Sequence, residues 1–250
     1  MSMNGGAHEE NHMNITVING TEQKGCTYSM KETFISAMGG GHEITEYYLP
    51  RDCPVFCIGC KACFFHDISV CPHREYTMPI WESILAADLL VFTSPTYVLH
   101  VTAQMKALLD HLATKWMAHS PERPMFGKRA VIITNAIGRG MGKTAGEIKD
   151  SLDFWGVART YVIMYPLLQA DWEMVAEKRK AKIRAGCIQI AAKIKAATRV
   201  RPRIKIKCIF FIMKTAQAMI DRSERKAGRE HTKDYLHWKE NGWLDGRKPW

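Results

Sequence analysis

The sequence contains no uninterrupted apolar run of the roughly 18 residues that a membrane-spanning helix needs. Its first twelve residues are polar and lack the apolar segment of a secretory signal. We therefore expect a cytoplasmic protein with a flexible lead over residues 1–12. Neither a Ser-His-Asp arrangement nor a pair of carboxylates stands out as acid–base machinery. Apolar residues make up 46% of the chain, which is ordinary for a globular protein.

The net charge of +10 is confined to the C-terminal part of the chain. Residues 193–233 hold 13 Lys and Arg against 3 Asp and Glu, and the rest of the chain holds 22 of each sign. A basic patch often indicates nucleic-acid binding, but no nucleic-acid-binding motif accompanies this one, so we do not expect that partner.

Residues 199–250 form an extension with a helix-breaking Pro202, an apolar helical pattern over residues 204–220 and an aromatic end. We expect this extension to pack on the core or on a partner subunit. The alternative is a basic amphipathic anchor that makes peripheral contact with a membrane.

Short apolar runs alternate with helical patterns over residues 13–198, which we interpret as one domain. Runs of β-branched and aliphatic residues predict five strands, at residues 15–18, 42–49, 89–92, 129–134 and 160–164. Apolar residues at helical spacing predict helices at residues 28–35, 79–87, 101–117, 143–154 and 171–195. This alternation predicts an α/β fold, a doubly wound five-stranded parallel sheet with a helical, basic C-terminal extension.

Ligands of such sheets bind outside the carboxyl ends of the strands, and three loops leave those ends here: residues 20–27, 94–100 and 135–142. The first loop joins a strand to a helix and is rich in glycine and hydroxyl groups. Backbone N–H groups at a helix N-terminus, together with the helix dipole, favour a phosphate at such a place. An ordinary turn between a strand and a helix is the alternative.

Three stretches together resemble the NADPH-dependent FMN reductase family, within the flavodoxin-like superfamily, over residues 13–195. Residues 87–97 look like the family's Ala-Asp…Ser-Pro-x-Tyr strand and loop, and residues 104–111 are similar to its Gln-x-Lys-x-x-x-Asp-Arg helix. The first loop is similar to the family's Gly-Ser-Pro-Arg-type phosphate loop, with Thr21 in place of Ser and Gln23 where Arg often stands. A neutral Gln23 leaves more of the phosphate binding to backbone N–H groups.

The resemblance implies a flavodoxin-like fold and a homodimer with the flavin near the subunit interface. In the family the second loop lines the flavin ring and the third approaches its other edge, where glycine allows close approach. The cofactor-binding residues expected on this basis are Gly20, Thr21, Gln23, Gly25, Cys26, Thr27 and Tyr28 in the first loop, Ser94, Pro95, Thr96, Tyr97 and Val98 in the second, and Asn135, Gly138 and Gly140 in the third. We also expect the helix N-terminus to lower the pKa of Cys26.

Four cysteines, Cys57, Cys60, Cys63 and Cys71, have the spacing C-x2-C-x2-C-x7-C-P. Thiolates at this density suit soft metals or iron–sulfur clusters, and bacterial ferredoxins use C-x2-C-x2-C-x3-C-P. The spacing is similar to that of iron–sulfur flavoproteins, a branch of the same family, which implies that these four residues bind a [4Fe-4S] cluster beside FMN. A loop without a cluster, as in many flavin reductases of the family, a zinc site and a redox disulfide are the alternatives.

The leading hypothesis is an FMN-dependent NAD(P)H oxidoreductase that passes a hydride to FMN and electrons to a small-molecule acceptor such as a quinone or another flavin. Under this hypothesis the flavin performs the redox reaction, and we assign no catalytic side chain. The second hypothesis is an electron carrier that holds FMN and a [4Fe-4S] cluster and works with a ferredoxin-type partner. The third is a flavin-binding regulatory or membrane-surface protein in which the basic extension is the functional part.

Overall fold

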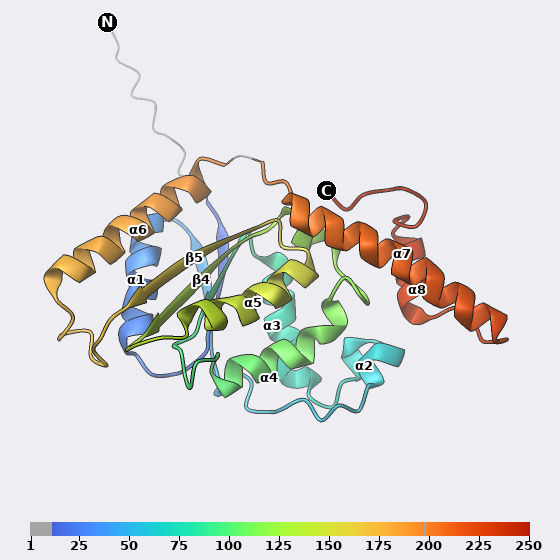
Figure 1. The fold of residues 1–250 in the computed structure, drawn as a ribbon, viewed down its shortest axis with the longest axis horizontal. Coiled ribbons are helices and arrows are strands. Elements are labelled where there is room, and N and C mark those ends of the chain that lie inside the picture. The colour runs from blue at the N-terminus through green and yellow to red at the C-terminus, as the bar shows by residue number, and fades with distance from the viewer. Residues whose placement is uncertain (1–11, 198) are drawn as a thin grey trace, which may run out of the picture.

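The structure, a computed structural model, describes residues 12–197 and 199–250. Most of the lead expected at residues 1–12 therefore lies outside the described residues. A central sheet is covered by helices, and two further helices of the C-terminal extension lie beside it (Figure 1). Among the described residues, no helix has the length and apolar character needed to cross a membrane.

The sheet is built from five parallel strands. They are β1 (Asn14–Asn19), β2 (Glu43–Tyr48), β3 (Leu89–Thr93), β4 (Arg129–Ala136) and β5 (Arg159–Pro166). Their order is β2-β1-β3-β4-β5, which is the flavodoxin-like order. Every residue of β3 is buried, because this central strand is covered on both faces. The predicted fold class and the five-stranded parallel sheet are confirmed.

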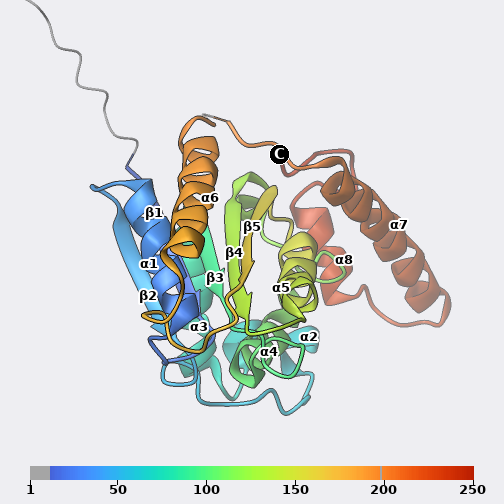
Figure 2. The same ribbon diagram turned by 60° about the vertical axis from the view of Figure 1, so that its left-hand side comes forward.

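Helices cover both faces of the sheet (Figure 2). They are α1 (Cys26–Met38), α3 (Arg74–Ala86), α4 (Ala103–His111), α5 (Met141–Trp155) and α6 (Glu177–Lys195), and the short helix α2 (Ala62–Phe65) lies in the cysteine-bearing segment. α1 and α6 cover one face, where Phe34 and Ile183 pack against Val17 and Val131 of the sheet. α3, α4 and α5 cover the other face, where Trp81 and Trp155 pack edge to face.

Two helices begin five or six residues away from their predicted starts, whereas the other three begin within two residues of theirs. α3 begins at Arg74, so Pro79 lies inside the helix instead of starting it. The carbonyl of Pro79 accepts a hydrogen bond of 3.0 Å from the Tyr47 hydroxyl, and the neighbouring Ile80 is fully buried, so packing offsets the N–H that proline lacks. α6 begins at Glu177 instead of residue 171.

Residues 167–176, between β5 and α6, form a loop whose apolar residues imitate a helical pattern. Val175 is buried and Trp172 packs against the same cluster from within this loop. The Asp171 carboxylate accepts a hydrogen bond of 3.1 Å from the Glu173 N–H, which closes a local turn before the helix starts. Because side chains of this loop are buried, the spacing of apolar residues resembles a helix already before Glu177, where α6 begins.

The extension forms α7 (Ile204–Lys226) and α8 (Lys233–Glu240). Phe210 and Ile206 of α7 form a buried cluster with Trp238, Trp243, Met117 and Phe126, and the last two belong to the segment between α4 and β4. The opposite side of α7 exposes an apolar stripe: Ile204, Phe211, Ile212 and Met219. The extension is thus anchored to the domain through one face of α7, with a second apolar face in contact with solvent.

The extension also contacts the cysteine-bearing segment. The carbonyl of Cys63 accepts a hydrogen bond of 2.9 Å from the Lys233 ammonium at the start of α8, and one of 3.3 Å from the Thr114 hydroxyl. The rings of Phe64 and His119 meet edge to face with their centroids 4.6 Å apart. Residues from the middle of the chain and from the C-terminal extension therefore hold this segment in place.

A buried cation joins α1 to the end of β1 and β2. The Lys31 side chain is fully buried, and its ammonium lies 2.9 and 3.0 Å from the two carboxylate oxygens of Glu46. The Asn19 amide and the Tyr48 hydroxyl also donate to this carboxylate, at 3.0 and 2.6 Å. Burial raises the pKa of Glu46, but the hydrogen bonds from Tyr48, Lys31 and Asn19 outweigh burial, so that the pKa lies below its ordinary value. The network fixes Asn19, the last residue of β1, directly before the first candidate loop.

We predict that Glu46→Gln lowers the free energy of unfolding at pH 7 by about 2 kcal/mol, because the buried Lys31 ammonium then keeps only the exposed Glu32 as a carboxylate partner. Since the folded pKa of Glu46 is depressed, its contribution is fully present above the unfolded value of 4.5 and is lost as the pH falls through the folded pKa. Urea unfolding of the wild type and the variant at pH 7 and in this acid range measures both effects. The exposed Glu43→Gln is the matched control, and equal stability of the two variants at pH 7 would refute the prediction.

Candidate functional site

Loops from four strands meet around a pocket of about 270 Å³ at the carboxyl edge of the sheet. Its lining residues are Thr21, Gln23, Gly25, Cys26 and Thr27 after β1, Pro95, Thr96 and Tyr97 after β3, Asn135, Ala136 and Ile137 at the end of β4, and Gln169 and Ala170 after β5. Nine of these are residues that the sequence analysis proposed for cofactor binding. None of the thirteen carries a charge as a carboxylate, ammonium or guanidinium group.

Gly20 positions the first loop without lining the pocket. Its N–H donates to the carbonyl of Thr93 at 2.7 Å, and its own carbonyl accepts from the Thr102 hydroxyl at 2.7 Å. A Cβ at this position would lie 2.8 Å from the Thr93 carbonyl oxygen, so only glycine lets β1 and β3 end this close together. The role of Gly20 in the structure is to set the direction of the loop.

The N-terminus of α1 points into the pocket without a side-chain cap. Gly25 is the N-cap residue, and α1 has no acidic residue in its first turn. The first N–H groups of a helix have no partner within the helix and attract anions. The Thr27 hydroxyl, in the first turn, instead donates to the Asn135 side-chain carbonyl and ties the first loop to the third.

The second loop is a tight turn that combines buried and exposed parts. Ser94 is fully buried, where its hydroxyl accepts from the Thr102 N–H at 3.1 Å and donates to the Pro95 carbonyl at 3.0 Å. Two backbone hydrogen bonds join Tyr97 and His100, at 3.0 and 2.9 Å. Ser94 therefore shapes the loop and, in contrast to Pro95 and Tyr97, does not line the pocket.

Val98 and Leu99 at the tip of this turn have φ angles of +50° and +70°. A β-branched residue rarely adopts this left-handed conformation, because its Cβ substituents crowd the backbone. The Val98 side chain is 93% exposed and does not line the pocket, although the sequence analysis proposed it for cofactor binding. The turn is held by its surroundings and projects two apolar side chains beside the pocket mouth.

The third loop packs onto the second. Gly140 has a φ angle of +103°, and a Cβ there would lie 2.8 Å from the Leu99 Cα, so the close contact of the two loops requires glycine. The Glu147 carboxylate pairs with the His100 ring and accepts a hydrogen bond of 3.2 Å from the Val101 N–H, which fastens the second loop to α5. Neither Gly138 nor Gly140 lines the pocket; Ala136 and Ile137 take that place.

Four lining residues were not predicted: Ala136 and Ile137, which lie in the predicted third loop, and Gln169 and Ala170, which lie in a loop that was not predicted. Only the last two belong to a new element of the site. They follow β5, whose carboxyl end lies at the same edge of the sheet as those of β1, β3 and β4, and this position was the signal that could have identified them. The Cys26 thiol lies 3.4 Å from the Ala170 carbonyl oxygen. Burial, and then the negative charge of Asp171, raises the pKa of Cys26, so the expected lowering by the helix N-terminus was wrong.

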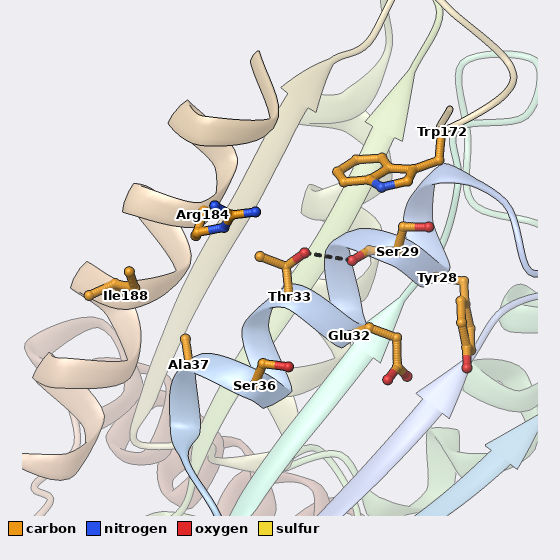
Figure 3. A pocket seen from close by; sticks show the side chains of 9 residues that line it. All are labelled: Tyr28, Ser29, Glu32, Thr33, Ser36, Ala37, Trp172, Arg184 and Ile188. Carbon is orange, nitrogen blue, oxygen red and sulfur yellow. Dashed lines mark hydrogen bonds between the residues drawn. The ribbon is translucent and has the colours of Figure 1, made fainter. Parts of the chain in front are cut away.

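Tyr28 faces a different hollow. It lines a groove of about 530 Å³ beside α1 and α6. Figure 3 shows Arg184 on α6 and Trp172 on the loop before it, both facing α1, and Tyr28 at the edge on the other side of α1. The ammonium groups of Lys31 and Lys24 lie 4.3 and 5.5 Å from the centre of the Tyr28 ring. The walls of this groove are outer faces of helices, whereas the smaller pocket collects the ends of four strands, where ligands of such sheets bind. We therefore assign the functional site to the smaller pocket.

The four cysteines of the C-x2-C-x2-C-x7-C run lie in one segment between β2 and α3. Cys57 and Cys60 are exposed, Cys63 and Cys71 are half-buried, and none forms a disulfide. Burial raises the pKa of Cys63, and the neighbouring thiols of Cys71, Cys57 and Cys60 raise it further. Cys63 thus lies within electrostatic reach of the other three, and their sulfur donors suit a soft metal or an iron–sulfur cluster.

Comparison with known proteins gives one family. The family model described as NADPH-dependent FMN reductase matches residues 13–164. An iron–sulfur flavoprotein from Archaeoglobus fulgidus is 24% identical over 209 residues, which span 82% of this chain and 86% of the relative.

Solved structures show the same fold at low sequence identity. An NADH:FMN oxidoreductase in its apo form is 16% identical, with a TM-score of 0.52 over 74% of this chain and 91% of the other. An FMN-dependent NADH-azoreductase from Bacillus anthracis in complex with FMN is 12% identical, with a TM-score of 0.53 over 74% of this chain and 100% of the other.

We predict that Val98→Asn raises the free energy of unfolding by about 1 kcal/mol, because asparagine tolerates the left-handed conformation that strains valine. The side chain is 93% exposed in the single chain, so little packing within the chain is lost. Urea unfolding measures the change. Val70→Asn, at an exposed valine whose φ angle is not positive, is the control and should not become more stable; the same shift in both variants would contradict a strained turn at Val98.

Proposed function

The chain belongs to the NADPH-dependent FMN reductase family, and we propose from this premise that it is an FMN-dependent oxidoreductase which oxidises NAD(P)H and reduces a small acceptor. The observation that carries the proposal is the pocket in which three glycine- and hydroxyl-bearing loops meet at the uncapped N-terminus of α1. A flavin mononucleotide has a phosphate at one end and a flat ring at the other. One end of this pocket offers backbone N–H groups that suit a phosphate, and the other offers flat or apolar side chains that suit a ring.

The phosphate end is supported by the donors at the start of α1. The N-cap residue Gly25 offers no side chain to the first N–H groups, and the Thr21 hydroxyl, which lines the same end, is held near the backbone by a hydrogen bond of 3.1 Å from the Gln23 N–H. Because no lining residue is cationic, the phosphate charge would be balanced by backbone N–H groups and the helix dipole.

The ring end is supported by the shape and chemistry of the second and third loops. Pro95 and Tyr97 lie on one wall and Ile137 on another, and these are flat or apolar surfaces suited to an aromatic ring. The Thr96 N–H donates to the Asn135 carbonyl at 2.9 Å, so this wall is rigidly joined to β4. A pre-formed wall of this kind orients a ring at low entropic cost.

When bound, FMN supplies the group that accepts a hydride from a nicotinamide. The residues of the chain bind the cofactor, orient it and limit the access of water. The raised pKa of Cys26 keeps this thiol protonated at neutral pH, so the pocket does not present a thiolate to the flavin. Because the flavin performs the reaction, the protein needs no acid–base pair of its own, and the uncharged lining of the pocket agrees with this.

A second subunit is part of the proposal. Exposed apolar side chains surround the pocket mouth: Tyr97 (50% exposed), Val98 (93%), Leu99 (51%), Ile137 (60%) and Leu168 (58%). Adjacent apolar side chains of this kind indicate an interaction surface. We propose that a homodimer covers this rim and leaves an apolar opening through which NAD(P)H and the acceptor reach the ring.

A second candidate function is electron transfer between FMN and a [4Fe-4S] cluster held by Cys57, Cys60, Cys63 and Cys71. The C-x2-C-x2-C-x7-C spacing of these cysteines supports it, as does the similarity to the iron–sulfur flavoprotein of A. fulgidus. Iron and acid-labile sulfide assays on anaerobically purified protein test this function. About four irons per chain would support it, and stoichiometric FMN without iron would leave the reductase alone.

The reductase itself is tested by adding FMN to the purified protein and following flavin fluorescence, and then by following NADPH and NADH oxidation with a quinone or free flavin as acceptor. Saturable binding of one FMN per chain with NAD(P)H oxidation is the expected result. Absence of FMN binding would overturn the proposal.

We predict that Gly25→Asp weakens FMN binding by roughly 10- to 100-fold, because the new carboxylate competes for the α1 N–H groups and repels the phosphate. Riboflavin, which has no phosphate, should bind the variant as it binds the wild type. Gly25 has a φ angle of −94°, and the nearest atom to an added Cβ is 3.8 Å away, so the substitution fits and also caps α1. Titrations with both flavins measure the effect.

Gly25→Asn is the matched control, because it adds the same shape without the charge. It should lose less FMN affinity than Gly25→Asp. If FMN and riboflavin weaken equally in the aspartate variant, the phosphate does not lie at the N-terminus of α1.

A further inference from the structure

Three metal-binding side chains meet at a point that takes no part in the pocket. Cys71, His73 and His111 each offer one ligand atom, and these atoms all lie within 4.8 Å of one another. Cys71 and His73 immediately precede α3, and His111 is the last residue of α4, so two separate elements provide the group. Among the described residues, no other set of three or more His, Cys, Asp or Glu side chains comes together this closely.

His111 is oriented as metal-binding histidines usually are. It is 4% exposed, and its Nδ1 lies 2.8 Å from the Ala107 carbonyl oxygen. A carbonyl can only accept, so Nδ1 carries the proton and Nε2 presents a lone pair. A backbone carbonyl that fixes the tautomer through the second ring nitrogen is the common outer partner of a metal-bound histidine.

His73 and Cys71 complete the group. The lone pair of His111 Nε2 lies 2.9 Å from Nδ1 of His73, which is therefore the donor of that hydrogen bond. A change of tautomer moves the His73 proton to Nε2 and frees Nδ1 as a second nitrogen ligand. The Cys71 sulfur accepts a hydrogen bond of 3.5 Å from the His73 backbone N–H, which holds the sulfur beside the pair of histidines.

We propose that Cys71 Sγ, His73 Nδ1 and His111 Nε2 bind one divalent metal ion of the zinc class. Zinc takes sulfur at about 2.3 Å and imidazole nitrogen at about 2.0–2.1 Å in a tetrahedron, which places ligand atoms about 3.4–3.6 Å apart. The two nitrogens, now 2.9 Å apart, need to separate by about half an ångström, and the sulfur needs to approach them by at most about 1.2 Å. Binding releases the Cys71 thiol proton, the two imidazoles stay neutral, and water fills the fourth position.

Two nitrogens and one sulfur suit a borderline-soft ion and not Mg²⁺ or Ca²⁺, which prefer oxygen. None of the three ligands lines the pocket of the proposed flavin site. The ion would instead fasten the cysteine-bearing segment to the end of α4, since Cys71 and His111 lie 40 positions apart in the sequence. Its role is therefore to stabilise this segment.

This site and a [4Fe-4S] cluster compete for Cys71, and different residues separate the two. The zinc-class site requires His73 and His111 and does not require Cys57. The cluster requires Cys57 and does not require either histidine.

The test is to purify the full-length protein, remove bound metal with a chelator, and titrate it with Co²⁺ and Zn²⁺. We expect about one ion per chain, with the visible bands of four-coordinate Co²⁺ and a thiolate-to-cobalt charge-transfer band. His73→Gln and Cys71→Ser should each weaken Zn²⁺ binding by about 100-fold or more, beyond what the loss of an outer partner costs. His111→Gln should do the same, and the half-buried His73 provides a variant that folds if the buried position does not tolerate change.

His66→Gln, at an exposed histidine of the same segment, and Cys57→Ser are the matched controls and should bind the ion as the wild type does. FMN titration of every variant should be unchanged, so failure of the metal site and failure of the flavin site give different results. The proposal is overturned if Zn²⁺ and Co²⁺ do not bind, if the histidine variants bind them as tightly as the wild type, or if the protein holds iron and sulfide that depend on Cys57 and survive the histidine substitutions.

Discussion

The parallel pairing of β1 with β3, and of β3 with β4, is the constraint on which the rest of this structure depends. It brings the carboxyl ends of β1, β3, β4 and β5 to one edge, so every loop that leaves a strand there meets the others. The 2.7 Å hydrogen bond from the Gly20 N–H to the Thr93 carbonyl extends this pairing one residue beyond the strands. From that bond onward the backbone is directed to the N-terminus of α1, and the pocket forms where this loop meets the loops after β3, β4 and β5.

None of the side chains that line the pocket proposed for FMN is charged, and this has a chemical consequence. An anion held by backbone N–H groups is held by dipoles that do not titrate, so the protein side of the interaction does not change with pH near neutrality. If the chain acts as the proposed reductase, the same neutrality leaves the selection of an acceptor to shape and apolar contact at the rim of Tyr97, Leu99 and Ile137. Such a site accepts flat, poorly charged molecules more readily than highly charged ones.

The sequence was sufficient for the sheet and for most of the pocket, and its limits follow from physical causes. Runs such as Leu89–Thr93 are recognisable because a strand buried on both faces must be continuously apolar. Tyr28 and Val98 were expected at the cofactor, but their backbone positions turn their side chains to other surfaces, which only the folded loops determine. The pairing of His73 with His111 joins residues 38 positions apart, and no local pattern of the sequence encodes such a contact.

The attachment of the extension to the core has a consequence for related proteins. The Cys63 carbonyl accepts hydrogen bonds from Thr114 and Lys233, and Phe210 and Trp238 pack in a cluster with residues of the core. Residues 199–250 do not behave as a separable module, because their apolar face completes the interior around Met117 and Phe126. A related protein that ends after α6 must fill that surface with other residues or make it polar. We therefore expect that the residues of the extension and those of the core surface beneath it have been substituted together during evolution.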